Sequence, residues 1–129
     1  MAESDGPATR TACVIAGATP AEVAAVGVHP RVELRANQLG TLATGRPGDL
    51  VLDYAAALPG PVYDIIYSAR TGWFSVTVFR GEAPPARWDN RPGADAGYPR
   101  LADVLGAATP AEILAALDVP PAVIGYADA

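Results

Sequence analysis

The chain has 129 residues, half of them apolar and 18 % charged, which is typical of one folded domain and excludes a chain that is disordered as a whole. Its net charge of −5 argues against nucleic-acid binding, which needs a basic face, and against docking on anionic membranes. All nine basic residues are arginine, and the absence of lysine excludes Schiff-base chemistry and a P-loop.

Cysteine and histidine are equally scarce. The single cysteine, Cys13, allows no internal disulfide, and together with the single histidine, His29, it offers no metal-ligand cluster. No cofactor is indicated. The first ten residues lack the basic and apolar regions of a signal peptide, and no segment is apolar enough to span a bilayer. We therefore expect a cytoplasmic protein.

The predicted elements begin after a small, polar stretch over residues 1–10, which we expect to be a flexible tail. The rest of the chain, residues 11–129, is expected to form a single domain. Residues 11–16 are a short apolar run with β-forming residues and predict a strand. Cys13 lies within this run, where a buried and unreactive thiol is the expected state.

The same helix-start sequence, Ala-Thr-Pro-Ala-Glu, occurs at residues 18–22 and at residues 108–112. In each copy threonine is the predicted N-cap, proline takes the first helical position and glutamate completes a capping box. These signals predict helices near 19–27 and 109–119. The sequences after the two copies differ, which favours a common helix start over an internal duplication.

Between the first helix and residue 60 the pattern is less decisive. Residues 31–37 alternate between apolar and polar side chains, which predicts a strand. Residues 50–58 have apolar side chains at helical spacing behind Asp49, a candidate N-cap, although Leu50–Leu52 alone could also form a buried strand. We expect a helix there.

A β-hairpin over residues 62–79 is the clearest element. An even number of residues in its turn places Ile65 and Tyr67 on one face with Phe74, Val76 and Val78, so we expect a two- or four-residue turn. The opposite face then carries Ser68, Arg70, Trp73, Ser75, Thr77 and Phe79. At the turn, Arg70 could stack on Trp73.

Residues 80–99 are dense in proline and glycine and are expected to form a long irregular loop, a type of segment that is often functional. The predicted fold is therefore α+β: a small antiparallel sheet centred on the hairpin, with the helices near 19–27 and 109–119 packed against it. A three-helix core with the hairpin as a wing is the competing arrangement.

The loop also contains the best candidate site. Residues 87–91 place two arginines, an aspartate, an asparagine and a tryptophan close together. Arginine binds carboxylates and phosphates through two hydrogen bonds, and tryptophan and arginine are frequent in protein interfaces. The candidate binding residues, including two from the hairpin, are Arg70, Trp73, Arg87, Trp88, Asp89 and Arg91.

Two functions remain open from the sequence. The first is a non-enzymatic binding or assembly module that engages a protein partner, or another copy of itself, through the arginine- and tryptophan-rich loop. The second is a small cofactor-free enzyme or small-molecule-binding protein with an apolar pocket, in which His29 and Asp89 are the candidate catalytic residues.

Overall fold

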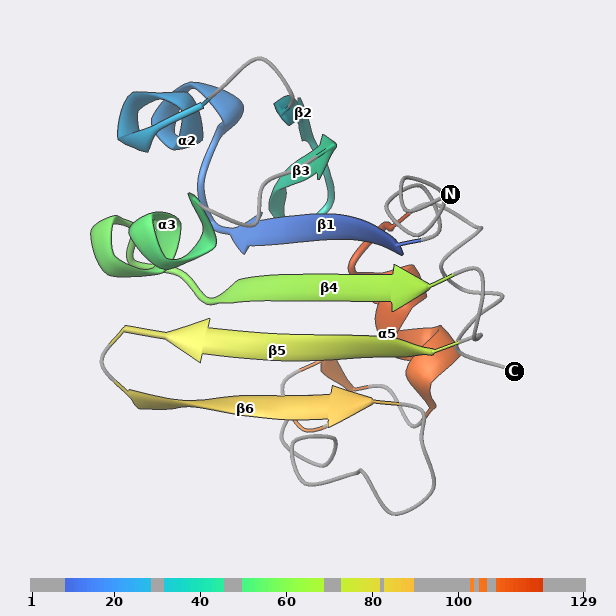
Figure 1. Cartoon of the computed structure of the whole chain (residues 1–129). Coiled ribbons are helices and arrows are strands. Elements are labelled where there is room, and N and C mark those ends of the chain that lie inside the picture. Colours follow the sequence, from blue (N-terminus) through green and yellow to red (C-terminus); the bar gives the residue numbers. More distant parts are fainter. Residues whose placement is uncertain are drawn as a thin grey trace.

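The computed structural model describes residues 9–28, 32–45, 50–68, 73–81, 83–89, 103, 105–106 and 109–119. These residues form one six-stranded antiparallel sheet with short helices packed on it (Figure 1). The strands are β1 (Thr9–Ala16), β2 (Val32–Ala36), β3 (Gly40–Gly45), β4 (Val62–Ser68), β5 (Phe74–Arg80) and β6 (Ala83–Asp89), and the helices are α2 (Pro20–Val26), α3 (Val51–Ala57) and α5 (Pro110–Ala116). The predicted α+β class is confirmed.

The strands lie in the order β2-β3-β1-β4-β5-β6. The predicted hairpin is β4–β5, with Ile65 opposite Val76 and Tyr67 opposite Phe74. The Ser68 N–H donates to the Trp73 carbonyl oxygen over 2.8 Å, so four residues, 69–72, lie between the members of this last hydrogen-bonded pair, the even number that the alternation predicted. Arg70 lies in that connection, outside the described residues.

Both predicted capping boxes are present. The Thr19 hydroxyl accepts from the Glu22 N–H at 3.2 Å, and the Glu22 carboxylate accepts from the Thr19 N–H at 2.8 Å. Thr109 and Glu112 make the same pair of hydrogen bonds at 3.2 and 2.9 Å. Residues 51–57 form α3, which confirms the helix that apolar spacing favoured over a strand.

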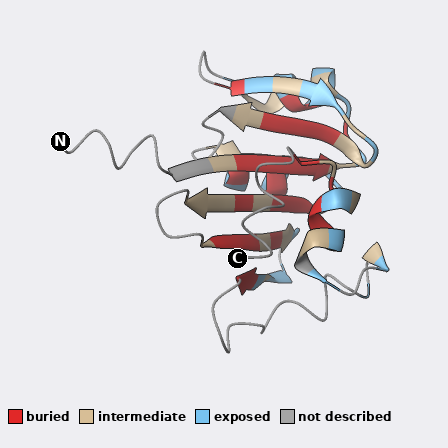
Figure 2. Cartoon of the chain, turned by 90° about the vertical axis from the view of Figure 1, so that its right-hand side faces the viewer, coloured by how far each residue is buried: buried red, intermediate tan, exposed pale blue. Residues whose placement is uncertain are grey.

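The sheet is buried on both faces. On one face α5 covers a cluster that includes Val14, Leu42, Tyr63, Ile65, Phe74, Val76, Trp88, Ile113, Leu114 and Leu117. On the other face α2 and α3 cover a cluster that includes Cys13, Ile15, Val23, Val32, Ala43, Val51, Tyr54 and Val62. Figure 2 shows the buried residues concentrated along the strands and on the inward sides of the helices. Burial of each large apolar side chain stabilises the fold by about 1.5–3 kcal/mol.

Strand β3 had no counterpart in the sequence prediction. Asn37 organises the turn that precedes it: its side-chain oxygen accepts from the N–H groups of Leu39 and Gly40, and its amide donates to the Leu117 carbonyl oxygen at the end of α5. The strand then pairs with β2 on one side and β1 on the other. Leu42 is its only large apolar side chain, so the sequence pattern alone gave little signal.

Part of the predicted irregular loop over residues 80–99 is also a strand. β6 pairs with β5, and the register of this pairing shifts between Val78 and Arg80. It contains Pro84 and Pro85, which argued against a strand, but β6 lies at the edge of the sheet, where proline is tolerated. The remainder of the predicted loop, residues 90–99, lies outside the described residues, as do residues 1–8 of the predicted tail.

We predict that Gly60→Ala destabilises the fold by about 1–3 kcal/mol, because a Cβ atom at this position would meet the backbone carbonyl of Ala16, which cannot move without disturbing β1. Gly27→Ala is the control, since its Cβ would meet only the flexible Leu50 side chain, at 3.2 Å. Urea denaturation measures both variants. Equal stability of the two would contradict the close approach at Gly60.

Candidate functional site

The candidate site is the part of the sheet that no described helix covers. α5 lies behind β4 and β5, whereas α2 and α3 cover the opposite face only at one end (Figure 1). This region, which we term the polar face, carries side chains of Asp64, Ile66, Trp73, Ser75, Thr77, Arg87 and Asp89, of which Ser75 and Asp89 are buried. Because directly opposed residues of antiparallel strands point to the same side, the pairings Asp64–Thr77–Arg87 and Ile66–Ser75–Asp89 define it.

Asp64 is the most unusual residue of the polar face. It lies in the middle of β4, between Cys13 on β1 and Thr77 on β5. Its Oδ1 atom is buried and, among the described residues, has no hydrogen-bond donor. Burial raises the pKa of this carboxyl group to about 6. The fold therefore holds a charge that is poorly solvated at neutral pH.

Cys13 contributes to that environment. Its side chain is fully buried. Burial, and to a lesser extent the negative charge of Asp64, raises the pKa of the thiol far above its ordinary value. Cys13 therefore stays protonated at neutral pH and is not an activated nucleophile, as the sequence predicted for a buried thiol.

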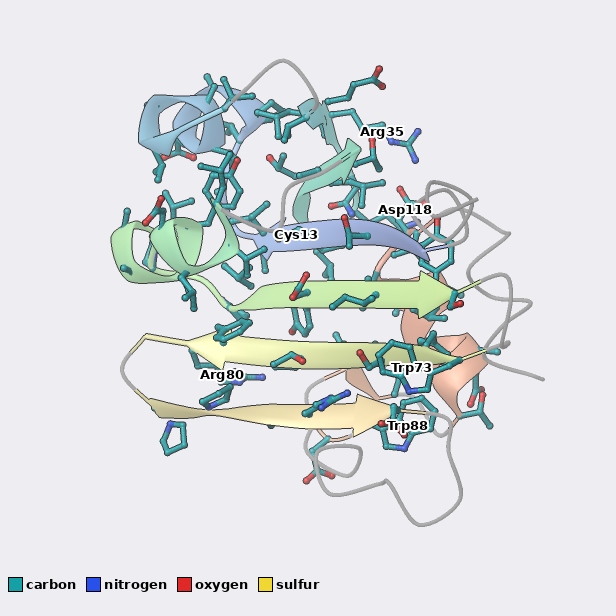
Figure 3. The ribbon with its side chains drawn as sticks, in the orientation of Figure 1. Cys13, Arg35, Trp73, Arg80, Trp88 and Asp118 are labelled. Carbon is teal, nitrogen blue, oxygen red and sulfur yellow. The ribbon has the colours of Figure 1, made fainter. Side chains whose placement is uncertain are left out.

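At the end of the polar face, three of the predicted binding residues come together. The Arg87 guanidinium lies 5.8 Å from the centroid of the Trp73 ring, a cation–π distance. Its Nη2 atom lies 3.8 Å from Oδ2 of Asp89. The Arg87 side chain is 53 % exposed, whereas that of Asp89 is 3 % exposed. Figure 3 shows Trp73 in front of β5 at the start of the strand.

Trp88, which the sequence predicted as a binding residue, does not belong to this surface. Neighbouring residues in a strand point to opposite faces, so Trp88 lies on the side of α5 while Arg87 and Asp89 lie on the polar face. Trp88 is 8 % exposed, and its ring centroid is 5.2 Å from that of Phe74. Trp88 is thus a core residue.

Other predicted site residues fall outside the described part of the chain: His29, Arg70 and Arg91. Asp64, in contrast, is a site residue that sequence reasoning did not select. The signal was available, because Asp64 is a charged residue at the centre of an alternating strand, on the face opposite Tyr63 and Ile65. The lack of solvation on that face could not be foreseen from the alternation.

Within the described ranges, no group of three or more histidine, cysteine, aspartate or glutamate residues is arranged to hold a metal ion. No helix in the same ranges is long and apolar enough to cross a bilayer. The chain matches no known family model, no curated protein and no solved structure.

We predict that Asp64→Asn stabilises the protein at pH 7 by on the order of 1–3 kcal/mol, because it removes a charge whose folded-state pKa is raised to about 6. Because the pKa of Asp64 is raised in the folded state, its contribution to the free energy of unfolding of the wild type is complete below about pH 4. That contribution is lost as the pH rises through 6. The free energy of unfolding of Asp64→Asn should therefore exceed that of the wild type by an amount that grows between about pH 4 and pH 6. Urea denaturation at a series of pH values measures this difference.

The control is Asp53→Asn, which removes the same charge from an exposed position on α3. An identical pH dependence of the wild type and the Asp64 variant would contradict the poor solvation of Asp64.

We also predict that Trp88→Ala lowers the free energy of unfolding by about 3–5 kcal/mol, because it removes a large core ring that packs on Phe74. Trp73→Ala, on the polar face, should cost much less, and Trp88→Phe should recover most of the loss. Thermal denaturation compares the three variants. A larger loss for Trp73→Ala than for Trp88→Ala would be inconsistent with the two orientations.

Proposed function

We propose that the chain is a non-enzymatic binding module and that its polar face engages a protein partner. The observation that supports this proposal most directly is Oδ1 of Asp64, a buried acceptor to which no described residue donates a hydrogen bond. A buried acceptor without a donor costs about 1–3 kcal/mol, and more when it is charged. A bound arginine or lysine side chain of a partner would supply the missing donor and offset that cost.

The surroundings of Asp64 suit such an interaction. Trp73 and Arg87 give the polar face a partly buried aromatic ring with a guanidinium group beside it, and these two residue types dominate interface hot spots. The hydroxyl groups of Ser75 and Thr77 lie between Asp64 and the Arg87–Asp89 pair. The face therefore offers an anionic anchor and an aromatic platform on one rigid sheet.

The overall charge favours the same class of partner. The chain carries a net charge of −5 and contains no lysine. On the polar face, Arg87 lies beside Asp89, whereas the residues directly opposite Asp64, Cys13 and Thr77, carry no positive charge. A partner segment with an exposed arginine or lysine would be steered toward this surface and complement it.

A small cofactor-free enzyme or small-molecule-binding protein is the second candidate. The pKa of Asp64, about 6, is the observation that favours it, because a general base works best with a pKa near the operating pH. In this alternative Asp64, rather than His29 or Asp89, would exchange the proton. The neighbours Cys13 and Thr77 provide no second ionised group for such a reaction.

The binding proposal can be tested with short capped peptides that carry either one arginine or one citrulline, which has nearly the same shape but no charge. The two indole N–H resonances separate the surfaces, because Trp73 lies on the polar face and Trp88 in the core. The arginine peptide should shift the Trp73 resonance much more than the Trp88 resonance, and Asp64→Asn should weaken that response. Equal responses to both peptides would overturn the proposed anchor.

Once the partner is isolated, we predict that Trp73→Ala weakens its binding by about 30-fold or more, the loss typical of an aromatic hot spot. Leu52→Ala is the matched control, because it removes an exposed apolar side chain, 66 % accessible, from α3 instead. Isothermal titration calorimetry measures both variants. Unchanged affinity for Trp73→Ala, with the fold intact by circular dichroism, would place the interface elsewhere.

A further inference from the structure

Strand β2 forms one edge of the sheet, far from the polar face. It pairs with β3, and no other described strand lies on its outer side (Figure 1). The Asn37 N–H donates to the Gly40 carbonyl oxygen over 3.0 Å. Because inward and outward groups alternate along an antiparallel strand, this bond fixes the direction of the others. The backbone N–H and C=O groups of Glu33 and Arg35 therefore form hydrogen bonds with β3, whereas those of Val32, Leu34 and Ala36 point outward.

The two edges of the sheet differ in their capacity to accept another strand. The edge strand β6 contains Pro84 and Pro85, which lack N–H donors and interrupt any further ladder. β2 has the sequence Val-Glu-Leu-Arg-Ala, with a donor at every position. Of the two, only the β2 edge has a complete set of outward donors and acceptors.

The side chains of β2 are complementary to those of a second β2 strand. In an antiparallel pair centred on Leu34, the outward-pointing residues Val32, Leu34 and Ala36 form the hydrogen-bonded pairs. Glu33 of each strand then lies opposite Arg35 of the other, in a non-hydrogen-bonded pair, where side chains approach most closely. Both residues are exposed, and Figure 3 shows Arg35 projecting from β2. The register in which the outward backbone groups are hydrogen-bonded therefore also forms two pairs of Glu33 with Arg35 across the interface.

The apolar side chains support the same arrangement. Leu34 points to the face covered by α2 and packs at the margin of the apolar cluster there, where it is only partly buried. At the centre of the pair, Leu34 would contact its counterpart and extend that cluster from one copy to the next. A strand with like charges at positions 33 and 35 would repel a second copy in the same register.

We propose that β2 is a self-association edge, through which a second copy of the chain adds its own β2 antiparallel to the first about a twofold axis at Leu34. The two sheets then become one continuous sheet. This proposal is independent of the partner site, because the polar face of β4–β6 lies at the opposite end of each sheet and stays open in the dimer. Each dimer would present two copies of that face.

Charge reversal tests the register directly. Glu33→Arg places like charges opposite each other twice per dimer, and Arg35→Glu does the same with the opposite sign. Each single variant should weaken dimerisation by about tenfold or more. The double variant E33R/R35E restores both pairs and should recover wild-type association. An equimolar mixture of the two single variants should form a heterodimer, because one strand is then wholly basic and the other wholly acidic.

Sedimentation velocity and native mass spectrometry measure these associations, with circular dichroism as the control for folding. Asp64→Asn and Trp73→Ala should dimerise like the wild type, which distinguishes this proposal from the proposed function. Ala36→Pro removes one outward donor from the exposed end of β2 and should weaken the dimer, whereas Ala36→Ser should not. A wild-type chain that stays monomeric at about 1 mM, or single variants that associate like the wild type, would overturn the proposal.

Discussion

The rest of the fold depends on β1, which is hydrogen-bonded along both of its edges. It is the first strand in the chain and yet lies in the interior of the sheet, with β3 on one side and β4 on the other. Its residues Ala12, Cys13, Val14 and Ile15 are buried on alternate faces, so the strand contributes to both apolar clusters. Such two-sided burial specifies the register strongly, because a slip by one residue would exchange the two faces.

This register has a direct effect on the candidate site. Once Cys13 is fixed opposite Asp64, the carboxylate cannot leave this position without a movement of the whole of β4. The same strand buries Tyr63 and Ile65 on the other face. The fold therefore accepts a poorly solvated charge because two large apolar side chains in the same strand are buried in return.

The same logic applies to the binding residues at the end of the polar face. Trp73 is followed by Phe74, and Arg87 by Trp88, so each candidate binding side chain has a buried aromatic neighbour in sequence. The packed rings of Phe74 and Trp88 hold the backbones of β5 and β6 together. A site built on strands that are anchored in this way changes little in geometry when a ligand arrives.

Local signals in the sequence were sufficient for much of this structure. The capping boxes at Thr19 and Thr109 and the alternation in the hairpin need only nearby residues, and these features were predicted correctly. β3 and β6 depend on distant partners: β3 is defined by its pairing with β1, and β6 tolerates its prolines only because it is an edge strand. The orientation of Trp73, opposite to that of Phe74, followed from the hairpin alternation, whereas that of Trp88 depends on β6 and could not be assigned while residues 80–99 were expected to be a loop.

The position of Cys13 has a kinetic consequence. A thiol-specific reagent cannot reach a fully buried sulfur while β1 keeps its two neighbours, and opening a single side of the strand leaves the other ladder in place. Reaction at this sole cysteine therefore reports how often the centre of the sheet opens, rather than fraying at its edges. The rate at which Cys13 is modified therefore measures this opening, and no engineered label is needed.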